Sequence, residues 1–399
     1  MKVLLVTNYF TDASRGGVEF HVQSLAEGLY KLGHSVTVLR TSELPTLFSV
    51  KDFVPIAPFA VNEETRFSVS ASKVAKLPGI RMMLNFLYRR KLGKTTVSWL
   101  KDNPNFLAEF DLIHHHDLVT SSVISKHISR KHTTTPQFWT NHLGEFLLLN
   151  SLPIIGNTIT RRMTSNYKFA FAPSTELSNQ KGISCPVEMV PNGADHKVFQ
   201  PLPTSTRDEV RQRLGWDAKE LVVIVPRRWA PTKGVLFAAE ALSTLPSGLN
   251  LRCVFVGAHE SDFEEYSRQI NECLIKTPIP VEIVGSVGQR EMANLLAASD
   301  LCLIPSLLEA VSLSALESLA CGTPVLSTNV GGLPDVVIPN HTGWLMQPKR
   351  ADEIAEQLLK ILKVDRATLR QMGQTGREMV IDSYSWESVA KRVSDEYEK

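Results

Sequence analysis

Two glutamates, Glu309 and Glu317, stand eight positions apart in the segment 305–335, and their side chains suit the binding of a sugar. A carboxylate accepts hydrogen bonds strongly, so two carboxylates at one site can hold the hydroxyl groups of a carbohydrate. The sequence predicts that Glu309 follows a buried strand at 300–305 and that Glu317 lies about one to two turns into the next helix. In an open α/β sheet, ligands bind at this edge of the strands.

The surroundings of the pair resemble the E-x7-E motif of retaining glycosyltransferases with the GT-B architecture, in particular glycosyltransferase family 4. The residues that fit the family pattern are Pro305, Ser306, Glu309, Glu317, Ala320, Cys321, Gly322, Thr323, Pro324, Val325, Gly331, Gly332 and Asp335. The alternative is a helix with two solvated glutamates in another Rossmann-like protein, and the flanking residues make that alternative the weaker one. The resemblance implies that Glu309 holds the transferring sugar and Glu317 the ribose. It also implies donor contacts from the residues between them, Ala310, Val311, Ser312 and Leu313.

A basic loop predicts how a diphosphate is held. Residues 221–234 form a strand that runs into this loop, with Arg228 and Lys233 five positions apart. A guanidinium and an ammonium at a strand end can neutralise the charge that builds on the diphosphate of a nucleotide sugar. The family version is Arg-Leu-x-x-x-Lys-Gly, so Trp229 and the additional Arg227 are departures that leave Arg228 and Lys233 in register. A solvated turn is the alternative.

The sequence contains no Asp-x-Asp pair, the arrangement with which many metal-dependent transferases hold a divalent ion on the diphosphate. With Arg228 and Lys233 available, we expect charge neutralisation without a metal ion and no cofactor. A metal held by other ligands stays open.

Two further loops at predicted strand ends are candidates for donor binding. Gly16 and Gly17 precede a helix at 18–32, whose backbone amides and partial positive charge can meet an anion. Ser286 and Val287 fall in a segment whose backbone holds the base in the resembled family. An ordinary βα turn is the alternative for each loop. The sequence lacks a Gly-x-Gly-x-x-Gly fingerprint, which argues against a nicotinamide dehydrogenase.

Several histidines are candidates for contact with the transferred sugar or the acceptor. His142 occupies the place of the family's Thr-x-His histidine, which contacts the sugar or the acceptor, and it could polarise a hydroxyl or carry a proton. A structural histidine is the alternative. Of the consecutive His114, His115 and His116, only the first and last share a face of a strand. We interpret that pair, together with Asp111, as structural or acceptor-side rather than as a metal site.

The resemblance implies that the anomeric configuration is retained. No two carboxylates are convincingly placed as nucleophile and acid, so we favour front-face substitution, in which the leaving phosphate oxygen takes the proton of the acceptor. The expected catalytic residues are His142, Glu309, Arg228 and Lys233. A covalent intermediate on Glu309 is the rival mechanism.

Alternating strand and helix patterns over 399 residues predict an α/β protein with two Rossmann-like domains. The resemblance implies the GT-B fold, in which the domains face each other across a deep cleft and the C-terminal helix crosses back. A segment rich in proline at 191–203 marks the boundary. We therefore expect an acceptor-side domain, 1–197 with helix 385–399, and a donor domain, 198–384. Domain closure is expected with substrate bound.

Residues 65–101 contain basic side chains and no acidic one, so this part of the chain is expected to meet an anion. A helix at 78–94, with an apolar stripe at Ile80, Met83, Leu84 and Leu87, can lie on an anionic membrane or hold an anionic acceptor. The basic candidates on it are Arg81, Arg89, Arg90 and Lys91. An ordinary crossover helix with its stripe in the core is the alternative.

Composition predicts a cytoplasmic protein, with peripheral contact to the inner face of the membrane as the further expectation. Hydrophobic residues make up 43% of the chain, no apolar run is long enough to span a bilayer, and the five cysteines are scattered. No nucleic-acid partner is expected.

We expect a hexosyltransferase that moves sugar from a nucleotide-diphosphate donor to a hydroxyl of a carbohydrate or lipid-linked acceptor in glycan, polysaccharide or glycolipid synthesis. UDP-sugar is preferred on family frequency, and GDP-mannose stands second. The alternatives are a UDP-sugar epimerase of the same architecture and a non-catalytic nucleotide-sugar-binding subunit. The sequence leaves open the sugar, the linkage and the oligomeric state.

Overall fold

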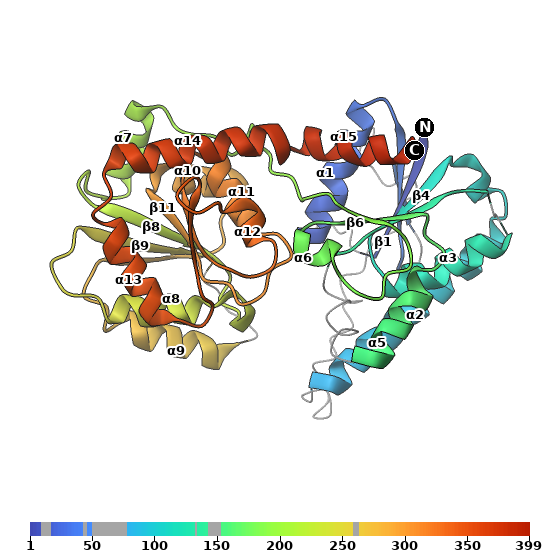
Figure 1. Cartoon of the computed structure of the whole chain (residues 1–399), viewed down its shortest axis with the longest axis horizontal. Helices are drawn as coiled ribbons and strands as arrows, with labels where there is room; N and C mark the ends of the chain where they lie inside the picture. Colours follow the sequence, from blue (N-terminus) through green and yellow to red (C-terminus); the bar gives the residue numbers. More distant parts are fainter. Residues whose placement is uncertain (9–16, 43–45, 50–77, 132–133, 143–152, 258–262) are drawn as a thin grey trace. The chain divides into compact units, whose positions relative to one another are not determined.

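The computed structural model describes residues 1–8, 17–42, 46–49, 78–131, 134–142, 153–257 and 263–399. The chain divides into two compact units (Figure 1). Unit 1 comprises Met1–Pro191 and Val389–Lys399, and unit 2 comprises Asn192–Ser388. The structural boundary thus falls at Pro191, a few residues before the position expected from the proline-rich segment, and the second crossing falls inside the last helix.

Unit 1 is built on a seven-stranded sheet in the order β3-β2-β1-β4-β5-β6-β7. All neighbouring strands are parallel except β3, which runs antiparallel to β2. The strands are β1 (Lys2–Thr7), β2 (Ser35–Arg40), β3 (Thr46–Ser49), β4 (Leu112–His115), β5 (Gln137–Thr140), β6 (Phe169–Ala172) and β7 (Val187–Met189). Five of these strands, β3 to β7, are short, with three or four residues each.

Helices cover both faces of the unit 1 sheet. The helices are α1 (Gly17–Lys31), α2 (Pro78–Asp102), α3 (Val119–Lys131), α5 (Pro153–Thr164) and α6 (Thr175–Ser178), with a 3-10 turn η4 (Phe106–Glu109). Leu100 of α2 and Ile124 and Ile128 of α3 pack in one cluster with strand residues, so these helices share a face. The last helix, α15 (Trp386–Tyr397), ends within unit 1, as the resemblance to GT-B enzymes implied. There the Ser394 hydroxyl is hydrogen-bonded to His34 at 2.7 Å.

Unit 2 is a doubly wound domain around a six-stranded parallel sheet in the order β10-β9-β8-β11-β12-β13. Its strands are β8 (Leu221–Pro226), β9 (Leu251–Val256), β10 (Val281–Val284), β11 (Leu301–Ile304), β12 (Val325–Thr328) and β13 (Gly343–Met346). Its helices are α7 (Thr204–Arg213), η5 (Pro231–Lys233), α8 (Val235–Ser243), α9 (Glu264–Leu274), α10 (Gln289–Ala298), α11 (Leu313–Ala320), α12 (Leu333–Val336), α13 (Ala351–Ile361) and α14 (Arg366–Ser383). Helices α8, α9 and α13 contribute to the core on one face and α7, α10, α11 and α12 to the core on the other, while α14 contributes to both.

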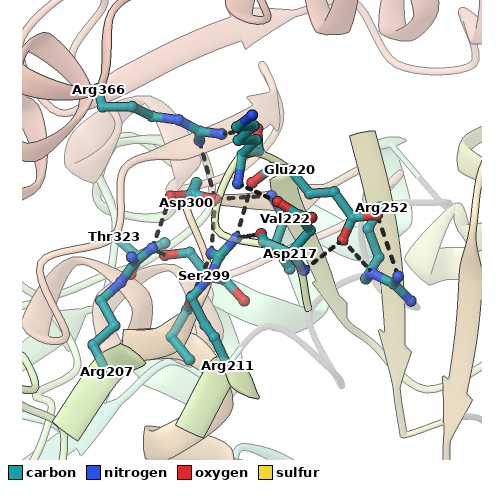
Figure 2. Close-up of polar contacts among 12 residues, drawn as sticks. Arg207, Arg211, Asp217, Glu220, Val222, Arg252, Ser299, Asp300, Thr323 and Arg366 are labelled. Carbon is teal, nitrogen blue, oxygen red and sulfur yellow. Dashed lines mark hydrogen bonds and ion pairs between the residues drawn. The ribbon is translucent and has the colours of Figure 1, made fainter. Parts of the chain in front are cut away.

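An ion-pair cluster fixes the amino edge of this sheet (Figure 2). Asp300, just before β11, pairs with Arg207 at 2.7 Å, Arg211 at 3.1 Å and Arg366 at 3.0 Å. Its carboxylate also accepts a hydrogen bond from the backbone of Val222 at 2.9 Å. The cluster ties α7 and the start of α14 to β8 and β11, which leaves the opposite, carboxyl edge for a ligand site.

None of the described helices has both the length and the apolar character needed to cross a membrane.

Candidate functional site

Strands β8 and β11 lie side by side at the point where the unit 2 sheet reverses its order. From β8 the chain winds outward through β9 to β10, and from β11 it winds in the other direction through β12 to β13. The two connections therefore diverge at the carboxyl ends of these strands, which is where open α/β sheets bind ligands. Arg227 follows β8 directly and Glu309 lies on the loop after β11. The predicted donor motifs thus meet at the edge where such folds bind ligands.

Glu309 is the centre of a charged cluster at this switch point. Its Oε1 atom lies 2.7 Å from the Arg227 guanidinium and 2.8 Å from Lys233 Nζ. The Ser306 hydroxyl donates to the same oxygen at 2.9 Å. Burial favours the protonated acid, but the two cations outweigh that effect and hold the pKa of Glu309 below its usual value. The carboxylate is therefore ionised and, on this geometry, can offer Oε2 to a sugar hydroxyl.

The two adjacent arginines differ in burial. Arg227, which the family pattern treats as an extra residue, is the buried one, and it also donates to the Ser312 hydroxyl at 2.5 Å. Arg228, the residue in register with the family motif, is exposed beside it. Trp229, the other departure from the pattern, is buried in the core against Phe255. Sequence register does not show which of two adjacent arginines turns inward, so Arg227 was missed.

Two glycines bring other loops against the segment that contains Glu309. Gly234 has a positive φ of 66°, and a Cβ there would lie 1.9 Å from the carbonyl oxygen of Pro305. Gly331 has a φ of 57°, and a Cβ there would lie 1.8 Å from the carbonyl oxygen of Glu309. Only glycine can occupy such positions without moving the backbone. The glycines after Lys233 and in the Gly-Gly stretch therefore set the position of the Glu309 loop.

Helix α11 begins directly after this loop and points its amino end to the same edge. Ser312 is its N-cap, but the serine hydroxyl makes no capping hydrogen bond and instead accepts from Arg227. The N–H of Ala315 bonds the Ser312 carbonyl at 3.0 Å, whereas the Ser312 side chain caps none of the first N–H groups, and the helix dipole favours an anion there. The expected donor residues Ala310, Val311, Ser312 and Leu313 all lie at this helix start.

Glu317 lies in the second turn of α11, as the sequence predicted. Burial raises its pKa to about 7, and the nearby Arg227 only partly opposes that rise. Close to neutral pH, this carboxyl is therefore present in both protonation states. A hydroxyl-rich ligand could select the ionised form by donating hydrogen bonds to it.

The other predicted donor residues lie in loops at strand ends or at a helix start. Ser286 and Val287 form the loop between β10 and α10, where Ser286 is exposed and Val287 packs partly against the core. Gly17 is the first residue of α1. Gly16 lies outside the described residues.

Unit 1 has its own switch point, between β1 and β4, and histidines gather there. His114 and His116 share a face as predicted, with ring centroids 4.3 Å apart and the rings stacked. His115 turns to the other face, where it is hydrogen-bonded to Gln137 at 3.1 Å. His142, after β5, lies with Nε2 3.2 Å from Nδ1 of His116. His142 is thus one member of a histidine cluster.

The sequence analysis missed His21, the helical member of this cluster. It lies on the buried face of α1, and its ring centroid is 4.7 Å from that of His142. Burial lowers the pKa values of His114, His116 and His142 well below their usual value, and the neighbouring imidazoles lower them further. These three side chains are neutral near pH 7. A single histidine in an amphipathic helix carries no sequence signal that would have singled it out.

The predicted basic helix exists but is longer than expected, since α2 extends to Asp102. The apolar stripe is not in the core: Met83 is 54% exposed and Leu87 is 54% exposed. Arg90 and Lys91 are exposed on the same helix, whereas Arg89 is partly buried and bonds Asn85 at 3.3 Å. The side chains of Ile80 and Arg81 lie outside the described residues.

Comparison with known proteins decides the family. The family model described as Glycosyltransferase Family 4 matches residues 15–198, and the model described as Glycosyl transferases group 1 matches residues 206–379. The chain is a GT-B glycosyltransferase of the family 4 type. The first family model covers most of unit 1 and the second most of unit 2, so this glycosyltransferase carries both halves of the GT-B fold.

Its relatives are sugar-transferring enzymes. It is 31% identical, over 53% of its length and 48% of the relative's, to an MMP alpha-(1->4)-mannosyltransferase of Mycolicibacterium hassiacum. It is 24% identical, over 96% of its length and 79% of the relative's, to the GPI3 subunit of a phosphatidylinositol N-acetylglucosaminyltransferase of Saccharomyces cerevisiae. Among solved structures, Anabaena HepE in complex with UDP matches with a TM-score of 0.73 at 18% identity, covering 100% of both chains. The chain spans about half the length of the first curated relatives that it matches.

Proposed function

We propose that this glycosyltransferase moves a hexose from a UDP-sugar to a hydroxyl of a carbohydrate or lipid-linked acceptor, with retention of the anomeric configuration. The observation that carries the proposal is the convergence of Arg227, Lys233 and Glu309 beside the amino end of α11. A site with two cations and the amino end of a helix suits a diphosphate, and a carboxylate next to them suits the sugar attached to it. UDP is preferred to GDP-mannose on its frequency in the family.

The proposed reaction is a front-face substitution. The bond between the anomeric carbon and the donor phosphate oxygen breaks as the acceptor oxygen bonds to the same carbon from the same side. The leaving phosphate oxygen takes the proton of the acceptor, so UDP departs and no enzyme carboxylate is glycosylated. Lys233 and the arginines stabilise the negative charge on the departing diphosphate, which is the main electrostatic task. His142 contacts the sugar or acceptor as a neutral imidazole.

Charge neutralisation by side chains makes this a metal-independent transfer in our proposal. Arg227 and Lys233 both pair with Glu309. A diphosphate would compete for the two cations, which would release Glu309 to the sugar. Loading of the donor and freeing of the sugar-binding carboxylate would thus be one event.

The test is a thermal-shift screen with UDP, GDP, ADP, dTDP and NAD, with and without Mg²⁺, on the wild-type protein and on Lys233→Ala. We expect stabilisation by UDP that does not need Mg²⁺ and that Lys233→Ala removes. Product analysis of a matching UDP-sugar by NMR should then give the retained anomer. Stabilisation by NAD alone, an absolute need for Mg²⁺, or a glycosyl adduct on Glu309 in mass spectra would overturn the proposal.

We further propose that α2 brings unit 1 to an anionic membrane, where a lipid-linked acceptor would be found. The exposed apolar residues Met83, Leu84 and Leu87 together with Arg90 and Lys91 support it. Apolar side chains enter the headgroup region while basic ones pair with anionic lipid.

A further inference from the structure

Three elements of unit 1 each bring one histidine to the same point. His21 comes from α1, His116 from the end of β4 and His142 from the end of β5. Strands β1, β4 and β5 are neighbours in the sheet, so these residues meet at its carboxyl edge. One ring nitrogen of each histidine lies within 4.8 Å of the corresponding nitrogens of the other two. Three imidazoles that converge so closely are a donor set for a metal ion.

We propose that His21, His116 and His142 form a binding site for a divalent transition metal of the Zn²⁺ class. Two imidazole nitrogens bound to one tetrahedral Zn²⁺ ion lie ~3.4 Å apart, since each Zn–N bond is ~2.1 Å. Nδ1 of His116 and Nε2 of His142 are already 3.2 Å apart. In the proposed site this pair forms one edge of the coordination tetrahedron, and a ring nitrogen of His21, within 4.8 Å of both, supplies the third ligand.

The burial of the cluster suits metal binding. His21 is 3% exposed and His116 is 0% exposed. Besides its contact with His142, His116 has a second nitrogen, Nε2, that is buried and without a hydrogen-bond partner among the described residues.

Among the residues that the structure describes, the site brings together three metal-binding side chains. His114, the nearest further histidine, has Nδ1 bonded to Tyr397 at 2.5 Å and Nε2 bonded to Thr140 at 2.7 Å. It therefore supports the cluster by stacking on His116 and is not itself a ligand. Three histidines and an open fourth position are the ligand arrangement of catalytic zinc sites such as that of carbonic anhydrase, whereas closed structural sites have four protein ligands. Imidazoles select Zn²⁺, Co²⁺, Ni²⁺ or Cu²⁺ over Mg²⁺ and Ca²⁺.

A metal at this position would engage His142. The lone pair that binds the ion is then withdrawn from the sugar or acceptor hydroxyl, so metal binding and transfer compete for one side chain. We therefore expect Zn²⁺ to inhibit transfer, and a chelator to restore it. The metal-binding part of this inference is independent of the proposed function, and only the inhibition rests on it.

The test uses the full chain, freed of metal by a chelator and titrated with Co²⁺ as a spectroscopic probe. We expect one equivalent to produce the visible absorption bands of tetrahedral Co²⁺, and Zn²⁺ to displace it. His21→Gln and His116→Gln should each weaken binding by at least about 100-fold, since each removes a ligand. His115→Gln is the matched control, because His115 is as deeply buried and adjacent but faces Gln137.

The outcomes separate cleanly. A wild-type chain that yields no tetrahedral Co²⁺ spectrum would overturn the proposal, and so would undiminished binding in both cluster variants. If the variants do not fold, X-ray absorption of the wild-type Zn²⁺ complex is the deciding measurement. Three imidazoles are expected in the first coordination shell. A different ligand set would place the site at other residues and overturn the proposal. Zinc inhibition that persists in His21→Gln would place the inhibitory ion elsewhere.

Discussion

The hydroxyl of Tyr397 lies 2.5 Å from Nδ1 of His114, although 283 residues separate the two in sequence. The other nitrogen of His114 is bonded to Thr140 at 2.7 Å, two positions before His142. The end of α15 is thereby connected through one imidazole to the end of β5. Both ring nitrogens of His114 are satisfied, which fixes the ring on which His116 stacks.

Replacing Tyr397 by Phe should destabilise unit 1. The ring stays, but a buried imidazole nitrogen loses its partner, which costs roughly 1–3 kcal/mol of the free energy of unfolding. Denaturant unfolding measures the effect, and Tyr30→Phe is the control because Tyr30 is 44% exposed. A Tyr397→Phe protein as stable as the wild type would show that the hydrogen bond contributes nothing.

Replacing Glu309 by Gln should destabilise unit 2 in the absence of ligand. Arg227 and Lys233 would remain at a buried position without their shared counter-charge, a loss of roughly 3 kcal/mol. UDP should restore more stability to this variant than to the wild type, because the diphosphate supplies the missing negative charge. Thermal unfolding with and without UDP measures both effects. Glu265→Gln, which breaks an exposed pair with Arg268, should change neither.

Replacing Gly234 by Ala should displace the Glu309 loop. Two penalties add here: the left-handed φ of 66° and a Cβ placed 1.9 Å from the Pro305 carbonyl oxygen. Gly215→Ala isolates the first penalty, because Gly215 has a φ of 70° and nothing within 4 Å of the added Cβ. We expect Gly215→Ala to cost about 1 kcal/mol of unfolding free energy. Gly234→Ala should cost at least about twice that and abolish UDP binding. Equal losses in the two variants would contradict the close approach.

The positions of the candidate donor residues were predictable because these residues lie in short sequence motifs. Strand ends, a helix start and fixed glycines place Lys233, Glu309 and Glu317 through local sequence alone, and the structure brings the first two together. The choice between Arg227 and Arg228 was not predictable, since it depends on how the loop after β8 turns.

The histidine cluster shows the opposite case. The position of His114 and His116 on one face of the strand follows from the alternation of side chains along a strand, and it was predicted. The contributions of His21 and Tyr397 depend on how α1 and α15 pack on the sheet, and no local pattern encodes that packing. The exposed stripe of α2 was also left open, because periodicity predicts an apolar face without saying what covers it.

The double substitution Met83→Ser and Leu87→Ser should weaken binding to anionic vesicles. Both side chains are exposed on α2, and their loss removes apolar area that would enter the headgroup region, so affinity should fall roughly 10-fold. Co-sedimentation with phosphatidylglycerol vesicles measures it, and binding should decline with salt. Ile275→Ser is the control, since Ile275 is 84% exposed but belongs to unit 2. The membrane proposal would be wrong if the wild-type protein did not co-sediment with such vesicles.

Replacing Glu317 by Gln should stabilise the ligand-free protein at high pH. Burial raises the pKa of Glu317 from its ordinary 4.5 to about 7. In the pH window between these two values, the folded state therefore holds more protons than the unfolded state. Stability contributed by the protonated acid is then lost as pH rises through the window. The variant should exceed the wild type by up to about 3 kcal/mol at pH 8, with the gap closing below pH ~5.

The Glu317→Gln change should weaken the binding of UDP, because an amide replaces the carboxylate that is proposed to hold the ribose. Stability and ligand affinity would therefore move in opposite directions, which a purely structural role of Glu317 does not produce. Unfolding measured at pH 5 and pH 8, with UDP titrated at pH 8, tests both parts. A variant less stable than the wild type at pH 8 would mean that the attraction of Arg227 exceeds the cost of burial and that Glu317 is already ionised at neutral pH.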